Sequence, residues 1–159
     1  MDKSVFKSFV ILSLIVGIIF GVLSPVPILG TVVLLALLFL SAPLVMIYLI
    51  MDGKFDLETI KDSIVYGAIA GMFANISFAF TYAIITAIIY AITQYSSNLL
   101  LTTMIINSPI WLLIVVILFM GVLTATTNAF SGVVTYYTIN LIRDIYEKKH
   151  NNSNNNFKL

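Results

Sequence analysis

The chain has 159 residues, of which 60% are hydrophobic and 9% charged, and its net charge is +1. Charged residues make up about a quarter of a typical soluble domain, so this composition excludes a water-soluble protein. The scattered basic residues argue against a nucleic-acid partner, and the absence of cysteine excludes disulfides, thiolate catalysis and cysteine-based metal sites.

Four apolar segments approach or exceed the length that a helix needs to cross a bilayer, which is about 20 residues. We predict helices over about 5–23, 28–51, 63–92 and 109–142. The predicted fold class is an all-α integral membrane protein, with four transmembrane helices arranged as two antiparallel hairpins in one domain over residues 1–149. The asparagine-rich segment 150–159 is predicted to be a disordered tail.

Prolines end the first segment and interrupt the second. Pro25 and Pro27 stop the first helix because each lacks a backbone N–H, and the short turn there predicts that the first two helices are antiparallel. Pro43 lies inside the second segment. We expect a kink or a local change of helical geometry near Leu40, with the freed backbone groups bonded by Ser41 or by a neighbouring helix. A tolerated kink is favoured over a functional hinge.

The stretch from Asp52 to Asp62 carries the densest charge between the helices. Its carboxylates lack the spacing of a calcium-binding loop, which favours a solvated connector. Asp56 is a good N-cap residue, so the third helix is expected to begin near Leu57 and to enter the membrane at Ser63.

Small residues recur at helical spacing in three of the four segments. Membrane helices approach closely at such residues, and Gly-x-x-x-Gly is the best-known pattern. The first and third segments each contain this pattern, and the fourth carries a stripe of small and polar residues. The residues predicted to pack helices together are Gly17, Gly21, Gly67, Gly71, Ala74, Gly121, Ala125, Ser131 and Gly132.

Polar side chains also lie inside the apolar segments. They are Asn75, Asn128, Thr81, Thr124, Thr127 and Thr135. Counted from the charged ends of their segments, Asn75 and Asn128 lie at a similar depth of about 20 Å. We therefore expect the two amides to pair across the third and fourth helices. The alternative is that either amide faces a wet cavity.

A short apolar segment precedes the fourth helix. Residues 99–106 are too few to span the membrane and are expected to lie at its surface. Pro109 suits the first position of the fourth helix, where its missing N–H is not needed. Aromatic residues at this end are typical of a membrane interface, namely Tyr90, Tyr95 and Trp111.

Lysine and arginine gather near both termini and in the central connector, whereas the other two connections carry no charge. By the positive-inside rule, both termini and the central connector are predicted to be cytoplasmic. We expect a multi-pass protein of the cytoplasmic membrane, in contact with the lipid bilayer.

The apolar cores of the four segments contain no Asp, Glu, Lys, Arg or His. Proton-coupled transport, voltage sensing and intramembrane proteolysis usually need such groups, so no enzyme activity, cofactor or metal is expected. The favoured hypothesis is a non-catalytic packing or accessory subunit that forms a homo-oligomer or binds another membrane protein. The alternative is a small pore or facilitator for a small polar or neutral solute, lined by Thr124, Thr127, Asn128, Ser131, Asn75 and Thr81.

Overall fold

The computed structural model describes residues 3–26, 29–94 and 99–155. It contains five helices in these ranges and no strand: α1 (Lys3–Leu23), α2 (Leu29–Met51), α3 (Ile60–Thr93), α4 (Leu99–Asn107) and α5 (Ile110–Asn155). Four of them, α1, α2, α3 and α5, are long and apolar enough to cross a membrane. The prediction of an all-helical chain with four helices of this kind is confirmed, and it suggests a multi-pass membrane protein. The hairpin arrangement and the side of the termini stay predictions.

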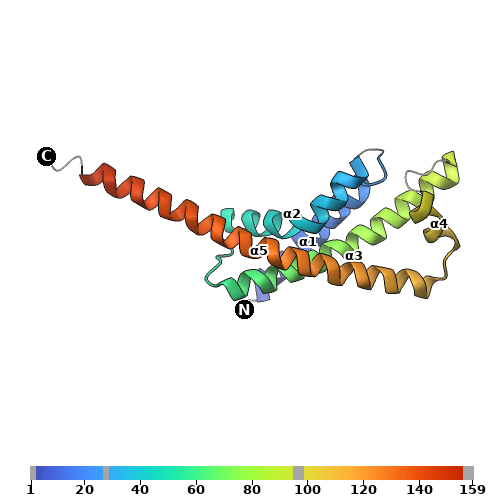
Figure 1. Cartoon of the computed structure of the whole chain (residues 1–159), viewed down its shortest axis with the longest axis horizontal. Helices are drawn as coiled ribbons and strands as arrows, with labels where there is room; N and C mark the ends of the chain where they lie inside the picture. The colour runs from blue at the N-terminus through green and yellow to red at the C-terminus, as the bar shows by residue number, and fades with distance from the viewer. Residues whose placement is uncertain (1–2, 27–28, 95–98, 156–159) are drawn as a thin grey trace.

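The helix α3 lies at the centre of the bundle and contacts each of the other four helices. The N-terminus and the α2–α3 connector lie at one end, here called the charged end (Figure 1). The turn between α1 and α2 lies at the opposite end together with α4, and this is called the uncharged end. The long helices cross near the middle of the bundle and diverge towards the uncharged end (Figure 1). The two ends are therefore packed differently.

Glycines in α1 allow it to approach α3 closely. A Cβ atom on Gly17 would overlap the carbonyl oxygen of Ala74 and the hydroxyl of Ser77. A Cβ atom on Gly21 would lie 2.7 Å from the Cβ of Thr81. Because hydrocarbon offers no hydrophobic drive for helix association, such close backbone contacts are a main source of packing energy in a membrane.

The same device joins α3 to α5. A Cβ atom on Gly71 would overlap the carbonyl oxygen of Thr124, and one on Gly67 would overlap that of Asn128. From the α5 side, a Cβ atom on Gly132 would overlap the carbonyl oxygen of Ser63. The small faces of α1, α3 and α5 are thus used inside the bundle.

Not every residue of the predicted stripe lies in such a contact. Gly121 is buried, but a Cβ atom there would lie 3.6 Å from its nearest neighbour, the side-chain nitrogen of Asn75, which is an ordinary contact. Ala125 is only half-buried, and Ser131 is buried with its hydroxyl bonded to its own helix. Close approach is therefore confined to part of the stripe.

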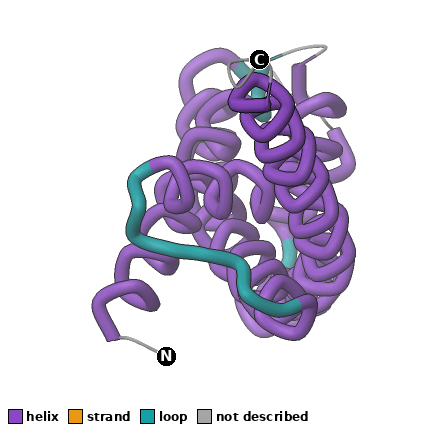
Figure 2. The backbone as a smooth tube through the Cα atoms, turned by 90° about the vertical axis from the view of Figure 1, so that its left-hand side faces the viewer, coloured by secondary structure: helices purple, strands orange, loops and turns teal. Residues whose placement is uncertain are grey.

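The charged end is closed by large side chains. The rings of Phe9, Phe55 and Tyr66 form a cluster with centroids 4.6–5.8 Å apart. Leu57 from the connector is only 3% exposed and joins the same core. Figure 2, which looks onto the charged end, shows the connector running across the bundle. Phe55 and Leu57 thus cover the bundle at this end.

The start of α3 differs from the prediction. Thr59, not Asp56, is the N-cap residue, and its side-chain oxygen accepts a hydrogen bond from the backbone N–H of Asp62 at 3.1 Å. Asp56 is occupied elsewhere, because it accepts a hydrogen bond from Arg143 at 2.7 Å. The helix begins at Ile60, three residues after the predicted start at Leu57.

The helix α5 begins at Ile110, just after Pro109, and continues beyond the predicted end at Ile142. The apolar run stops at Ile142, but residues 143–155 contain no Gly or Pro to break the helix. Residues 150–155 form the last part of α5, residues 156–159 lie outside the described ranges, and the disordered tail stays a prediction.

Candidate functional site

The side-chain amide of Asn128 is fully buried between α5 and α2. Its oxygen accepts a hydrogen bond from the backbone N–H of Ala42 at 2.8 Å. Its nitrogen lies 2.9–3.0 Å from the carbonyl oxygens of Leu37 and Leu38 in α2 and of Thr124 in α5. Asn128 therefore serves the packing of the bundle and faces no wet cavity.

The predicted pair between Asn75 and Asn128 is wrong. Asn75 donates to the carbonyl oxygen of Ile117 at 3.2 Å, whereas Asn128 bonds to α2. The reason is the register of α3 against α5. Asn128 faces Gly71, which lies about one helical turn before Asn75, and Asn75 faces Gly121, about two turns before Asn128. A similar distance from the charged ends of the two segments therefore did not bring the two asparagines into contact.

The remaining polar side chains at these seams are bonded or packed within the bundle. Ser77 donates to the carbonyl oxygen of Leu14 in α1 at 2.9 Å, which ties α3 to α1. Thr81 is half-buried and packs against Gly21. Hydroxyls that bond to carbonyls of their own helix belong to Thr124, Thr127, Ser131 and Thr135.

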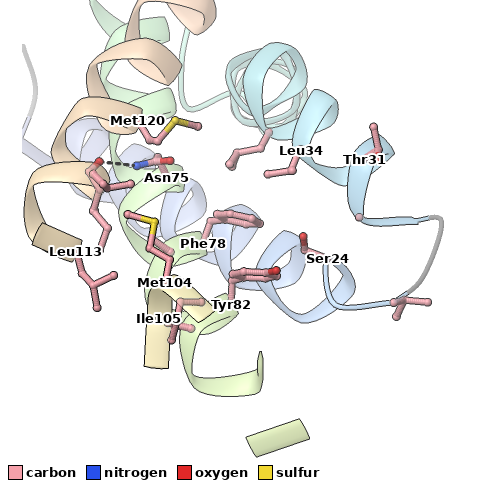
Figure 3. Close-up of a pocket in the computed structure, with 17 residues that line it drawn as sticks. Ser24, Thr31, Leu34, Asn75, Phe78, Tyr82, Met104, Ile105, Leu113 and Met120 are labelled. Carbon is pink, nitrogen blue, oxygen red and sulfur yellow. Dashed lines mark hydrogen bonds between the residues drawn. The ribbon is translucent and has the colours of Figure 1, made fainter. Parts of the chain in front are cut away.

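A cavity of about 320 Å³ lies at the uncharged end, between the diverging parts of α2, α3 and α5. The α1–α2 turn and α4 also contribute to its wall. Figure 3 shows its mainly apolar lining. Apolar side chains in this wall include Leu34, Phe78, Met104, Ile105, Leu113 and Met120. Of the six residues predicted to line a pore, only Asn75 lines this cavity.

Few polar groups reach the cavity. Asn75 lies at its inner end, and Tyr82, on the same face of α3, lies closer to the uncharged end and to Ser24 in the α1–α2 turn (Figure 3). Thr31 of α2 completes the polar lining. Among the described residues, no charged side chain lines the cavity. The site is therefore neutral and mostly apolar, with one amide deep inside.

The floor of the cavity is tightly packed. Ala74 and Asn128 are 0% exposed, and Leu37 is 1% exposed. Beyond them lie the close backbone contacts of α3 with α5 and the aromatic cluster of the charged end. Through the described residues, the cavity is thus a blind pocket.

A second, shallower space of about 500 Å³ lies between α2 and α5 towards the charged end. It is lined mainly by apolar side chains around Pro43, with Ser131, Thr135 and Thr138 at its side. Most of these side chains, such as Phe39, Phe130 and Ile142, are exposed on the outer surface of the bundle. This groove is a continuation of that apolar surface.

The described residues contain no group of three His, Asp or Glu side chains placed to hold a metal ion.

The aromatic residues expected at the uncharged end differ in their exposure. Trp111 is 65% exposed and Tyr90 is half-buried, whereas Tyr95 lies outside the described ranges.

Comparison with protein-family models, with curated proteins and with solved structures finds no match. The functional argument therefore depends on the geometry of this chain.

The sequence carried one signal for the cavity that hydrophobicity alone did not reveal. Asn75, Phe78, Ala79, Tyr82 and Ala83 follow helical spacing on one face of α3 and all line the cavity. Alternation of large rings with alanines leaves gaps beside the rings. Whether a neighbouring helix fills those gaps depends on how far α2 and α5 diverge, which no local pattern determines.

Proposed function

We propose that this chain is a non-catalytic membrane protein that binds a small apolar or amphipathic molecule, taken up from the bilayer, in the cavity at the uncharged end. The observation that carries the proposal is a blind, uncharged pocket between α2, α3 and α5. Native ligand sites are commonly concave and mostly apolar with a few placed polar groups.

The volume sets the size of the ligand. An apolar cavity of about 150 Å³ holds a benzene molecule, and small-molecule sites span roughly 300–1,000 Å³. The cavity of about 320 Å³ therefore suits a ligand of roughly 10–15 non-hydrogen atoms by this scaling. This is smaller than a whole phospholipid and close to a medium-length alkyl chain.

Binding fits the site better than catalysis or passage. The polar lining consists of an amide and three hydroxyls, without the paired nucleophile and base that a reaction would require. The packed floor at Ala74 and Leu37 argues against passage of solute through the bundle. Of the residues predicted to line a pore, all except Asn75 lie away from the cavity, Thr124 and Thr127 among them.

The distribution of charge supports a location of the cavity in the outer leaflet. The connector and the segment after Arg143 carry most of the charge, whereas the α1–α2 turn and α4 carry none. By the positive-inside rule, the charged end faces the cytoplasm in a cytoplasmic membrane, and ligand enters from the opposite half of the bilayer.

Photolabelling in lipid nanodiscs tests the proposal. The probe is 1-decanol carrying a diazirine, and labelled peptides are mapped by mass spectrometry. We expect saturable labelling of α3, α4 and α5 residues that line the cavity. Ala79→Phe, which fills the cavity from α3, should abolish this labelling. Ala87→Phe is the matched control, because Ala87 lies on the same helix but is exposed. Labelling that never saturates, or that both variants retain, would refute a binding site here.

A second candidate is a role as an accessory or homo-oligomeric subunit. The observation that favours it is α5, which continues to Asn155 and extends beyond the bundle (Figure 1). Leu141 and Ile145 are 60% and 58% exposed there. The small-residue faces do not support this role, because Gly17, Gly71 and their neighbours are used within the bundle.

A single engineered cysteine tests this second candidate, since the chain has none of its own. Ile145→Cys should form a disulfide-linked dimer in native membranes if α5 pairs with another copy. Ile84→Cys is the control on α3, with a similar exposure of 59%. Equal dimer yield from the two positions would argue for random collision and against a subunit interface on α5.

A further inference from the structure

One acceptor group in the cavity has no partner. Asn75 is 2% exposed, and its amide nitrogen donates to the carbonyl oxygen of Ile117 at 3.2 Å. A carbonyl can only accept a hydrogen bond, so the nitrogen of Asn75 must face Ile117 and its oxygen must face away. Figure 3 shows the Asn75 oxygen on the opposite side of the amide from the dashed hydrogen bond of its nitrogen. Among the described residues, it accepts no hydrogen bond.

The same face of α3 carries a second such group. Thr86 lies about three helical turns beyond Asn75 and is 3% exposed, and its hydroxyl has no hydrogen-bond partner in the described part of the chain. Most buried polar groups in proteins are bonded, and an unbonded one usually has a structural explanation. Most other buried amides and hydroxyls at the seams of this bundle, such as those of Asn128 and Ser77, are bonded. The unbonded Thr86 hydroxyl lies on the same face of α3 as Asn75, which lines the cavity.

We infer that the cavity selects a neutral molecule with a hydroxyl group, and that the hydroxyl donates a hydrogen bond to the side-chain oxygen of Asn75. This inference rests on the proposed function and specifies the chemical class of its ligand, a medium-length alkyl alcohol. The ligand enters with its hydroxyl first, and its chain lies against Phe78, Leu34 and Met104.

The lining explains why the ligand is neutral. A charged group inside the cavity would meet no opposite charge, because the lining contains none, and an unpaired charge in an apolar site is very costly. A hydroxyl needs only one acceptor, which Asn75 supplies.

The rim groups cannot make the same selection. Ser24 is 6% exposed and lies in the turn after α1, at the end of the bundle and away from the inner end of the cavity (Figure 3). Asn75 lies about 10 Å deeper than Tyr82, given seven residues at 1.5 Å rise. A ligand hydroxyl that reaches this depth therefore meets the oxygen of Asn75 and not the rim groups.

The test compares two photoreactive probes in nanodiscs, diazirine-bearing 1-decanol and its methyl ether. The ether keeps the chain and loses the donor. Interhelical hydrogen bonds in membranes contribute about 0.6–1.7 kcal/mol, which corresponds to a preference of about 3- to 18-fold. We expect the alcohol to label the cavity with an apparent Kd lower by this factor than that of the ether.

Single substitutions test whether Asn75 causes the preference for the alcohol over the ether. Asn75→Leu has nearly the same size and should remove the preference by weakening alcohol binding only. Asn140→Leu, the same change on the half-buried face of α5 far from the cavity, should leave it intact. Thr86→Val should also leave it intact. A preference that survives Asn75→Leu, or that Thr86→Val removes, would overturn the role of Asn75.

The outcomes separate this inference from the proposed function. Equal, saturable labelling by alcohol and ether would overturn the hydroxyl requirement, since a water molecule would then satisfy Asn75, while the binding site would stand. Absence of saturable labelling by both probes would overturn the site itself. The comparison of the two probes on the unaltered chain requires no variant to fold.

Discussion

Asn128 accepts a hydrogen bond from the backbone N–H of Ala42, although the two residues are 86 positions apart in the chain. Ala42 directly precedes Pro43, and its usual partner within a helix is the carbonyl of Leu38, four residues earlier. Asn128 also donates to that carbonyl at 2.9 Å. One amide of α5 therefore bonds both members of a backbone pair in α2, at the point where proline disturbs the helix.

This relationship explains how the bundle accommodates Pro43. Proline lacks an N–H and its ring crowds the preceding turn, which loosens the local hydrogen bonds. In hydrocarbon, every loosened backbone group needs a protein partner. Asn128 supplies the partner, while Ser41 bonds to the carbonyl of Leu37. A neighbouring helix and Ser41 thus both bond to backbone groups just before Pro43, whereas a partner for the Phe39 carbonyl, which proline itself leaves free, stays a prediction.

Replacing Asn128 should destabilise the bundle strongly. Asn128→Leu leaves the buried backbone groups of α2 without their partner, which costs about 1–3 kcal/mol for an unsatisfied group. Unfolding in mixed micelles measures the loss. Asn140→Leu, at a half-buried position of the same helix, is the control and should cost less. Equal costs would show that Asn128 has no special role.

A double-mutant cycle tests the link to Pro43. Pro43→Ala restores an N–H and allows α2 to bond its own backbone regularly, so Asn128→Leu should cost less in that background. Coupled residues in direct contact typically show interaction energies of 0.5 kcal/mol or more. If the losses in unfolding free energy are strictly additive, the role of Asn128 does not depend on Pro43.

Two glycines on facing helices should respond oppositely to alanine. A Cβ atom on Gly71 would overlap the carbonyl oxygen of Thr124, so Gly71→Ala must force α3 and α5 apart, at a cost of about 1–3 kcal/mol. At Gly121 the nearest atom would be 3.6 Å away. Gly121→Ala should be neutral or slightly stabilising, because alanine favours the helix by up to about 1 kcal/mol.

Unfolding free energies in the same micelles measure both changes. Both glycines are buried in membrane-spanning helices, so a difference between the variants reports the space at each position. A loss at Gly121 as large as that at Gly71 would mean that the stripe on α5 is packed uniformly.

Periodicity in the sequence indicated which faces are buried, but not which helix meets them. The glycines of α1 and α3 stand at helical spacing, and the structure places them against α3 and α5. The axial register was not predictable in this way. Asn75 and Asn128 lie at similar depth, yet an offset between α3 and α5 leads them to bond to Ile117 and to α2 instead.

The cavity was even less accessible to sequence reasoning. Asn75 was identified as a polar residue at depth, but Phe78 and Tyr82 of α3 were not predicted to line a site. Their role depends on the divergence of α2 and α5, which arises from packing of whole helices. The N-cap of α3 was also not determined by residue type, because Asp56 and Thr59 both suit this position. The ion pair with Arg143 engages Asp56 and leaves Thr59 as the cap.

The cap of α3 can be tested directly. Thr59→Ala removes the oxygen that accepts from the N–H of Asp62, and loss of an N-cap costs about 0.5–2 kcal/mol. Asp56→Ala removes only an exposed ion pair with Arg143, for which about 0–1 kcal/mol is typical. Unfolding measurements should therefore rank Thr59→Ala as the more damaging change, and the reverse order would restore Asp56 as the cap.

The side of the membrane that each end faces can be determined with single cysteines, because the chain has none. Suitable positions are Glu58 in the connector, Glu147 in α5 and Asn107 at the end of α4, all exposed. Changing these residues to cysteine leaves every lysine and arginine in place, and with them the charges that set orientation. A membrane-impermeant maleimide added to intact cells should label Asn107→Cys, and should label the other two only after permeabilisation. Labelling of Glu147→Cys in intact cells would place the cavity in the cytoplasmic leaflet and reverse the proposed entry route of its ligand.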